Sequence, residues 1–162
     1  MVPMEKLPCA EKVYEAWTAI EDGRARLSDD GQTCSVTSSD GSKRYTVSRE
    51  TAPDGREVYR SNDNATYWQG YAGYPVIAML MLERKLPLDL TVAGWFAGVD
   101  WHAVNAAHKG DYAAAVAAVE AERHFKKERV THAAQDAEKV LEALASLDIQ
   151  VGRNGAKVEK LG

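Results

Sequence analysis

Three Asp-Gly pairs constrain the fold of this chain more than any other feature of its sequence. They lie at 30–31, 40–41 and 54–55, and short stretches of alternating apolar and polar residues flank each of them. Asp-Gly is favoured in tight β-hairpins, because both central residues of a type I′ turn need positive φ. The sequence therefore predicts a four-stranded antiparallel meander over 24–61.

The predicted strands carry apolar residues on one face and polar residues on the other, as in a sheet that packs on a core from one side. The apolar face consists of Ala25, Leu27, Cys34, Val36, Tyr45, Val47 and Val58. Such a meander needs a helical layer against its apolar face.

Helices are predicted before and after the meander. In 11–21 the apolar residues recur at three- and four-residue intervals, and Gly23 follows as a helix stop. Pro75 fits the first turn of a second helix, whose residues up to 82 are almost all apolar. We expect this second helix to be the buried centre of the domain, packed on the meander.

Short helices are predicted in the rest of the connecting region, 62–110. Asp89, Asp100 and Asp111 each stand where an N-cap is needed, and Gly98 and Gly110 follow the first two helices. An Asp N-cap accepts hydrogen bonds from the free amides of the first turn.

The third of these helices is expected to be long, because no Gly or Pro occurs between 111 and 147. A continuous helix there would measure about 55 Å, longer than a compact domain of this size. Its second half carries an apolar stripe: Val130, Ala137, Val140, Leu141, Leu144 and Leu147. We expect this stripe to bind a partner helix, most simply from a second copy of the chain in a homodimer.

An alternative is that the helix breaks near 122–128 and folds its stripe back onto the same chain. Arg123 and Lys126 interrupt the apolar register at that place. The first helix offers a matching apolar face of Val13, Trp17 and Ile20.

The last segment, 148–162, contains Asn154-Gly155 between short alternating stretches, which favours a terminal hairpin. Together these elements predict an α+β fold, organised as a single domain over 1–162.

One segment has the composition of a ligand pocket. Between 61 and 74 the chain combines aromatic rings, amides, a carboxylate and glycines: Asn62, Asp63, Asn64, Tyr67, Trp68, Tyr71 and Tyr74. Small-molecule sites use such groups, but the same rings also pack where a sheet meets a helix. On either alternative we expect Trp68 to be largely buried, so that Trp68→Ala costs about 3–5 kcal/mol.

No pattern of catalytic residues or metal ligands is present, so we predict no catalytic residue, metal or cofactor. Glu120, His124, Glu128, His132 and Asp136 stand four residues apart, but none forms the Glu-x-x-His pair of helical metal sites. We expect this series to be a solvated charge ladder.

Composition excludes several classes of protein. A net charge of −4 and a pI near 5.6 disfavour nucleic-acid binding. The apolar run 76–82 is too short to span a membrane, and the first ten residues do not resemble a signal peptide. Cys9 and Cys34 are expected to be free thiols, and a cytoplasmic location follows.

The sequence therefore favours a non-enzymatic interaction or assembly protein that self-associates through its C-terminal helix. The alternative is a protein or enzyme that binds a small molecule at 61–74.

Overall fold

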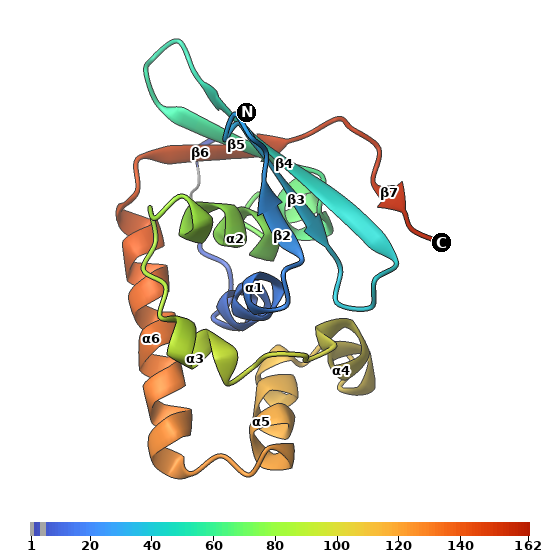
Figure 1. Ribbon diagram of the computed structural model, residues 1–162. Coiled ribbons are helices and arrows are strands. Elements are labelled where there is room, and N and C mark those ends of the chain that lie inside the picture. The colour runs from blue at the N-terminus through green and yellow to red at the C-terminus, as the bar shows by residue number, and fades with distance from the viewer. Residues whose placement is uncertain (1, 4–5) are drawn as a thin grey trace.

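The computed structural model describes residues 2–3 and 6–162. A mostly antiparallel sheet lies at one end of the molecule, and helices cover one of its faces (Figure 1). The strand order is β1-β6-β5-β4-β3-β2, and β7 pairs with β4. The strands are β1 (Val2–Pro3), β2 (Ala25–Leu27), β3 (Thr33–Thr37), β4 (Lys43–Thr51), β5 (Glu57–Ser61), β6 (Ile149–Arg153) and β7 (Glu159–Lys160).

The predicted meander is confirmed: β2 to β5 pair as antiparallel neighbours, with a turn at each Asp-Gly pair. The expected turn type is wrong, because only the glycines have positive φ, for example 71° at Gly31. The aspartates act through their side chains instead. Asp30 Oδ1 accepts a hydrogen bond from Gln32 N at 2.9 Å, and Asp40 Oδ1 accepts one from Ser42 N at 3.0 Å.

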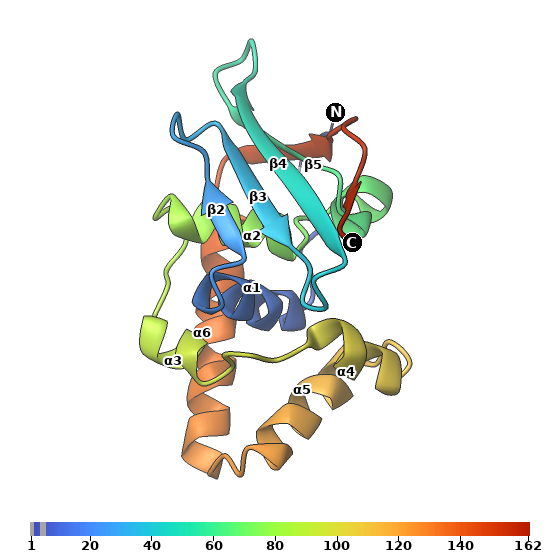
Figure 2. The same ribbon diagram turned by 45° about the vertical axis from the view of Figure 1, so that its right-hand side comes forward.

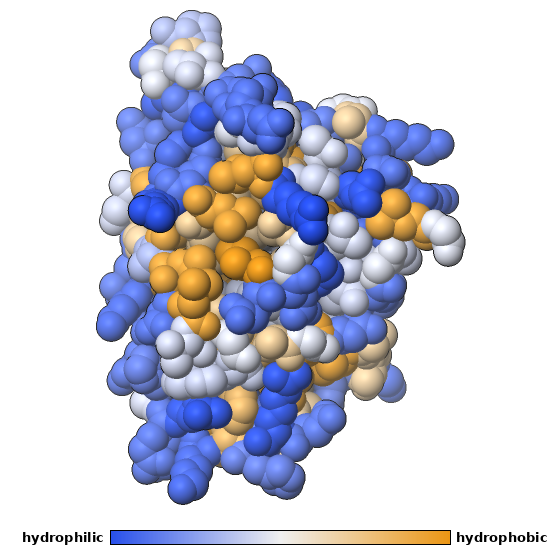
Figure 3. Space-filling view, in the orientation of Figure 1, coloured by the Kyte–Doolittle hydropathy of each residue, from blue (hydrophilic) through white to orange (hydrophobic). Residues whose placement is uncertain are grey.

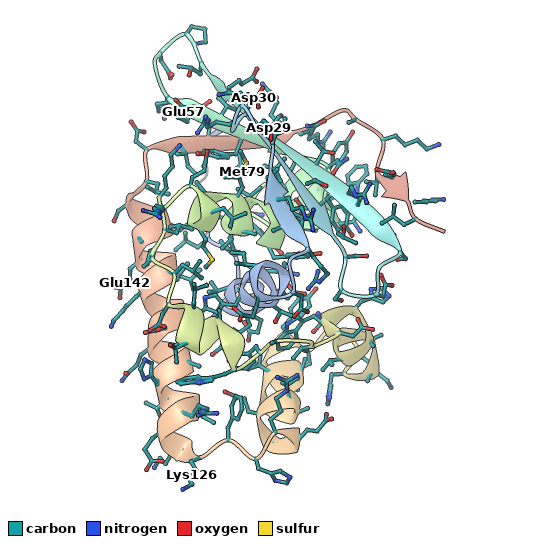
Figure 4. The ribbon with its side chains drawn as sticks, in the orientation of Figure 1. Asp29, Asp30, Glu57, Met79, Lys126 and Glu142 are labelled. Atoms are coloured by element: carbon teal, nitrogen blue, oxygen red, sulfur yellow. The ribbon has the colours of Figure 1, made fainter. Side chains whose placement is uncertain are left out.

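Two helices build the core beneath the sheet, and both were predicted. They are α1 (Glu11–Glu21) and α2 (Tyr74–Leu82). α2 packs on β2 to β5, and α1 packs on α2 from the side away from the sheet (Figure 1). Met79, labelled in Figure 4, is fully buried between α2 and the sheet.

The connecting region holds a π-helix, η1 (Ala65–Gln69), and the short helices α3 (Leu90–Gly94) and α4 (Trp101–Ala107). The predicted caps are confirmed. Asp89 accepts from Thr91 N at 2.9 Å, and Asp100 and Asp111 each accept from the amide three residues on.

The prediction of one continuous helix over 111–147 is wrong. The chain forms α5 (Tyr112–Glu122), turns, and returns as the long helix α6 (Lys127–Ser146), which packs on α1 (Figures 1 and 2). Lys126 marks the turn in Figure 4. His124 has a φ of 57° there, a rare conformation for a residue other than glycine.

Tertiary contacts stabilise this turn. Arg123 donates hydrogen bonds to the carbonyls of Trp95 at 2.9 Å and Ala97 at 2.7 Å. The Phe125 ring packs on Phe96, with centroids 5.5 Å apart. The turn thus brings the Phe125 ring into contact with other aromatic rings, a contact that a continuous helix would not make.

Because α6 folds back, half of the apolar stripe lies inside its own chain. Ala137, Val140 and Leu144 are at most 2% exposed, whereas Val130, Leu141 and Leu147 are half-buried. The three buried residues offer no surface to a second copy.

Figure 3 shows apolar side chains on the face that carries α2 and α3, where Leu90 is 60% exposed.

The predicted terminal hairpin is also wrong. β6 pairs in parallel with β5, placing Val151 opposite Tyr59, and antiparallel with β1. β7 pairs with β4. The edge of β5 offers β6 five residues of backbone pairing, more than a two-stranded hairpin at the chain end would provide.

Both cysteines are free thiols, as expected. Cys34 is fully buried under the meander, and burial raises the pKa of its thiol to about 12. Among the described residues, we find no helix with the length and apolar composition needed to cross a bilayer.

Candidate ligand-binding cleft

A cleft of about 720 Å³ opens where the segment after β5 meets the first half of α1 and the α4–α5 region. η1 and Tyr71 form one wall, and Asn105 of α4 and Tyr112 of α5 form another. Lys12 and Glu15 reach it from α1. Elements between residues 12 and 112 therefore converge on one hollow.

The charged part of the cleft comes from two buried residues of α1. Lys12 Nζ lies 3.1 Å from Glu15 Oε2, and their side chains are only 11% and 9% exposed. Asn105 Nδ2 donates to Glu15 Oε1 at 3.1 Å. The Lys12 ammonium also lies over the Tyr112 ring, 4.5 Å from its centroid.

Both oxygens of Glu15 are held inside the protein. Its Oε2 is closed off from solvent, and the Lys12 ammonium is the charged group beside it. Burial raises the pKa of Glu15, opposed by the Lys12 charge. For Lys12, burial lowers the pKa, but Glu15 outweighs it and the net shift is upward. Lys12 therefore stays an ammonium beside a destabilised carboxylate.

The structure places five of the seven residues predicted from the 61–74 segment in this cleft: Asp63, Asn64, Trp68, Tyr71 and Tyr74. The other two support it from outside. Asn62 accepts from Thr46 N at 2.9 Å and donates to the carbonyl of Ala156 at 3.1 Å, which fastens the C-terminal segment to β4. Tyr67 packs against Trp68.

Asp63 organises the turn that shapes this wall. Its carboxylate accepts hydrogen bonds from Ser61 Oγ and from Thr66 N, the latter at 3.1 Å. A Cβ at Gly73 would lie 2.1 Å from Asp63 Oδ2, so only glycine fits there. Both carboxylate oxygens of Asp63 are thus engaged in structure.

The expectation that Trp68 is buried is wrong, because its side chain stands at the cleft with 66% exposure. Tyr67 meets it edge-on at 4.8 Å, and the Arg153 guanidinium lies 5.4 Å from its ring. Arg153 is held in turn by a 2.9 Å hydrogen bond from its Nε to the Tyr67 carbonyl. The core beneath is filled by α2, which leaves Trp68 on the surface.

Tyrosines supply most of the remaining aromatic lining. Tyr45 and Tyr74 meet edge-on at 6.4 Å, and burial raises the pKa of both phenols. In the part of the chain that the structure describes, the hydroxyls of Tyr45, Tyr71, Tyr74 and Tyr112 make no hydrogen bond within the protein. These hydroxyls are therefore free to bond a ligand or water.

The sequence did not reveal Lys12, Glu15, Asn105 or Tyr112 as site residues. Lys12 and Glu15 are three residues apart on a helix, the usual spacing of a surface ion pair. Nothing local distinguishes them from a solvated face, because the groups that bury them come from α4 and α5.

The histidine series is only partly a solvated ladder. His132 Nε2 lies 3.8 Å from Asp136 Oδ1, and Asp89 brings a third possible ligand atom to within 4.8 Å. Asp89 already caps α3, and His132 with Asp136 is an ordinary helical pair. Glu120, expected in solvent, is instead only 8% exposed, and burial raises its pKa.

A protein-family model described as Uncharacterised conserved protein UCP014422 matches residues 5–150, nine-tenths of the chain. The chain belongs to that family. Comparison with the curated proteins and with the solved structures gives no match.

Proposed function

We propose that this member of the family binds a small molecule in the cleft between η1, α1 and α4. The observation that supports the proposal most is the convergence on one cleft of the two-thirds-exposed Trp68 ring and of tyrosine hydroxyls that no group of the described residues engages. The cleft volume of about 720 Å³ falls within the range of metabolite-sized sites.

Trp68 supports the same proposal from the rim. A tryptophan that is two-thirds exposed contributes little to the core, yet Tyr67 and Arg153 hold its ring from behind. An exposed ring of fixed orientation provides a flat surface on which a ligand can pack.

The proposal is tested by screening metabolites for thermal stabilisation and mapping hits by amide and indole chemical shifts. We expect a hit to shift Trp68, Tyr71 and the amides of η1. Trp68→Ala should weaken binding about tenfold, equivalent to about 1.4 kcal/mol. Leu90→Ala is the matched control, because Leu90 is equally exposed but lies outside the cleft.

Hits that shift only residues outside the cleft, or that bind Trp68→Ala as well as wild type, would contradict the proposal.

A further inference from the structure

We infer that the ligand of this cleft is an uncharged ring rich in hydroxyl groups, of the saccharide or cyclic polyol class. This inference rests on the proposed function and adds the chemical class of the ligand. Three properties of the cleft carry it: compensated charges, free hydroxyls and an exposed indole face.

The first property is that, among the described residues, each cationic side chain that lines the cleft already lies beside a carboxylate. Lys12 pairs with Glu15 at 3.1 Å. Arg24 lies 3.9 Å from Asp22 and donates to the carbonyl of Thr37. An anionic ligand would have to displace one of these carboxylates.

His102 follows the same pattern at the rim. Its side chain is 68% exposed, and its Nε2 lies 3.7 Å from Asp40 Oδ2. It therefore offers an anion no unopposed positive charge.

A cationic ligand is also disfavoured. Glu15 already faces the Lys12 ammonium, and the oxygens of Asp63 accept hydrogen bonds from Ser61 and Thr66. A second cation beside Lys12 would be repelled at short range, where the surroundings are partly dry. Burying an unpaired charge is strongly unfavourable. A neutral ligand avoids both penalties.

The second property is the kind of hydrogen-bonding groups left open. The hydroxyls of Tyr45, Tyr71, Tyr74 and Tyr112 line the cleft, and a hydroxyl can both donate and accept. A ligand hydroxyl also does both, so several hydroxyls on one ring can satisfy this set without a fixed donor pattern. Asn105 uses Nδ2 on Glu15, which leaves its Oδ1 to accept from the ligand.

The third property is the exposed face of Trp68. Indole faces carry negative potential, which attracts the weakly positive C–H groups of a sugar ring. Tyr67 and Arg153 fix the ring orientation, so little conformational entropy is lost on binding. The same ring cannot hydrogen-bond through its face, and it therefore selects the apolar side of such a ligand.

The test is calorimetric titration with glucose, galactose, xylose, myo-inositol and maltose, compared with adenosine, glutamate and spermidine. We expect at least one of the polyhydroxylated compounds to bind, with chemical-shift changes at the Trp68 indole. Trp68→Ala should weaken binding about tenfold, because it removes the ring face on which the ligand packs.

Tyr71→Phe is the second variant, because it removes one free hydroxyl and leaves the buried ion pair intact. We expect a loss of about three- to tenfold, the value of one neutral hydrogen bond. Leu90→Ala should bind like wild type.

The outcomes separate the two proposals. If adenosine, glutamate or spermidine shifts the cleft residues and the polyhydroxylated compounds do not, the inferred ligand class is wrong and the proposed function stands. If no compound from a broad metabolite screen shifts the cleft, both are wrong.

Discussion

Two buried polar residues on the same helix differ in the partners of their hydrogen-bonding groups. Thr18 and Glu15 are three residues apart on α1 and are 0% and 7% exposed. Thr18 Oγ1 donates to the carbonyl of Phe96 at 2.8 Å and accepts from Trp101 Nε1 at 2.8 Å. Glu15 has one oxygen bonded to Asn105 and the other held only by an ion pair.

The surroundings explain this difference. Thr18 lies beside the aromatic cluster in which Tyr14 contacts Trp17 at 4.9 Å and Phe96 at 5.0 Å. In this closed core, every polar group needs a partner within the protein. Glu15 lies at the base of the cleft, where its Oε2 is closed off from solvent and has the Lys12 ammonium beside it at 3.1 Å. Thr18 thus belongs to the closed core, whereas the Lys12–Glu15 pair forms a charged floor beneath the candidate site.

The largest effect is expected from placing a carboxylate in the closed core instead of at the cleft. Leu144 of α6 is fully buried in the hydrophobic core. Leu144→Asp should therefore destabilise the monomer by more than about 4 kcal/mol and leave it unfolded at room temperature. Leu141→Asp, on the half-buried side of the same helix, is the control and should remain folded.

Circular dichroism and sedimentation would measure both variants. A folded Leu144→Asp monomer released from a wild-type dimer would instead support self-association through the α6 stripe.

A smaller loss is expected at Thr18. Thr18→Val keeps the shape of the side chain but leaves the indole N–H of Trp101 and the carbonyl of Phe96 without their shared partner. The free energy of unfolding should fall by about 1–3 kcal/mol in urea denaturation. Thr18→Ser keeps the hydroxyl and should lose less than Thr18→Val; equal losses would show that packing rather than hydrogen bonding matters there.

Those parts of the fold that local chemistry determines were predictable from the sequence. Asp40 accepts a hydrogen bond from the amide of Ser42, two residues on. Asp89 caps α3 by accepting from amides two and three residues on. Interactions of this kind depend only on residues that are close together in the sequence. The meander and the capped helices follow from them.

The rest depends on partners distant in the sequence. His124 adopts positive φ without a glycine, because Arg123 and Phe125 find partners near Trp95. The 61–74 segment was found by its composition, but Glu15 was not, because Asn105 and the α4–α5 region bury it from 90 residues away. Local sequence patterns therefore predict the wall of the cleft formed by 61–74, but not the Lys12–Glu15 ion pair that forms its charged floor.

The ion pair at that floor should contribute nothing to stability. In Lys12→Met/Glu15→Leu, two apolar side chains of similar volume replace the pair. Such replacements of buried pairs are neutral or stabilising by about 1–4 kcal/mol, and we expect a gain of up to about 2 kcal/mol at pH 7.

The difference in stability between the double variant and wild type should depend on pH. Because burial raises the pKa of Glu15 in the folded protein, its contribution to stability is present below the ordinary glutamate pKa of about 4.3 and is lost as the pH rises. The advantage of the double variant should therefore be smaller at pH 4 than at pH 7. A loss above about 2 kcal/mol at pH 7 would show that the pair is structural.

The smallest effect is expected at Trp68. Its exposure predicts that Trp68→Ala changes the free energy of unfolding by less than about 0.5 kcal/mol. A loss of about 3 kcal/mol in urea denaturation would mean that the ring is buried in solution.

The most direct measurement is a carboxyl NMR titration of Glu15 in the folded protein, read at its Cδ. Burial of the Glu15 carboxylate at the floor of the cleft predicts an apparent pKa above the ordinary value of about 4.3 for glutamate. A pKa at or below the ordinary value in the free protein would mean that Glu15 is already satisfied like Thr18, and would contradict the account.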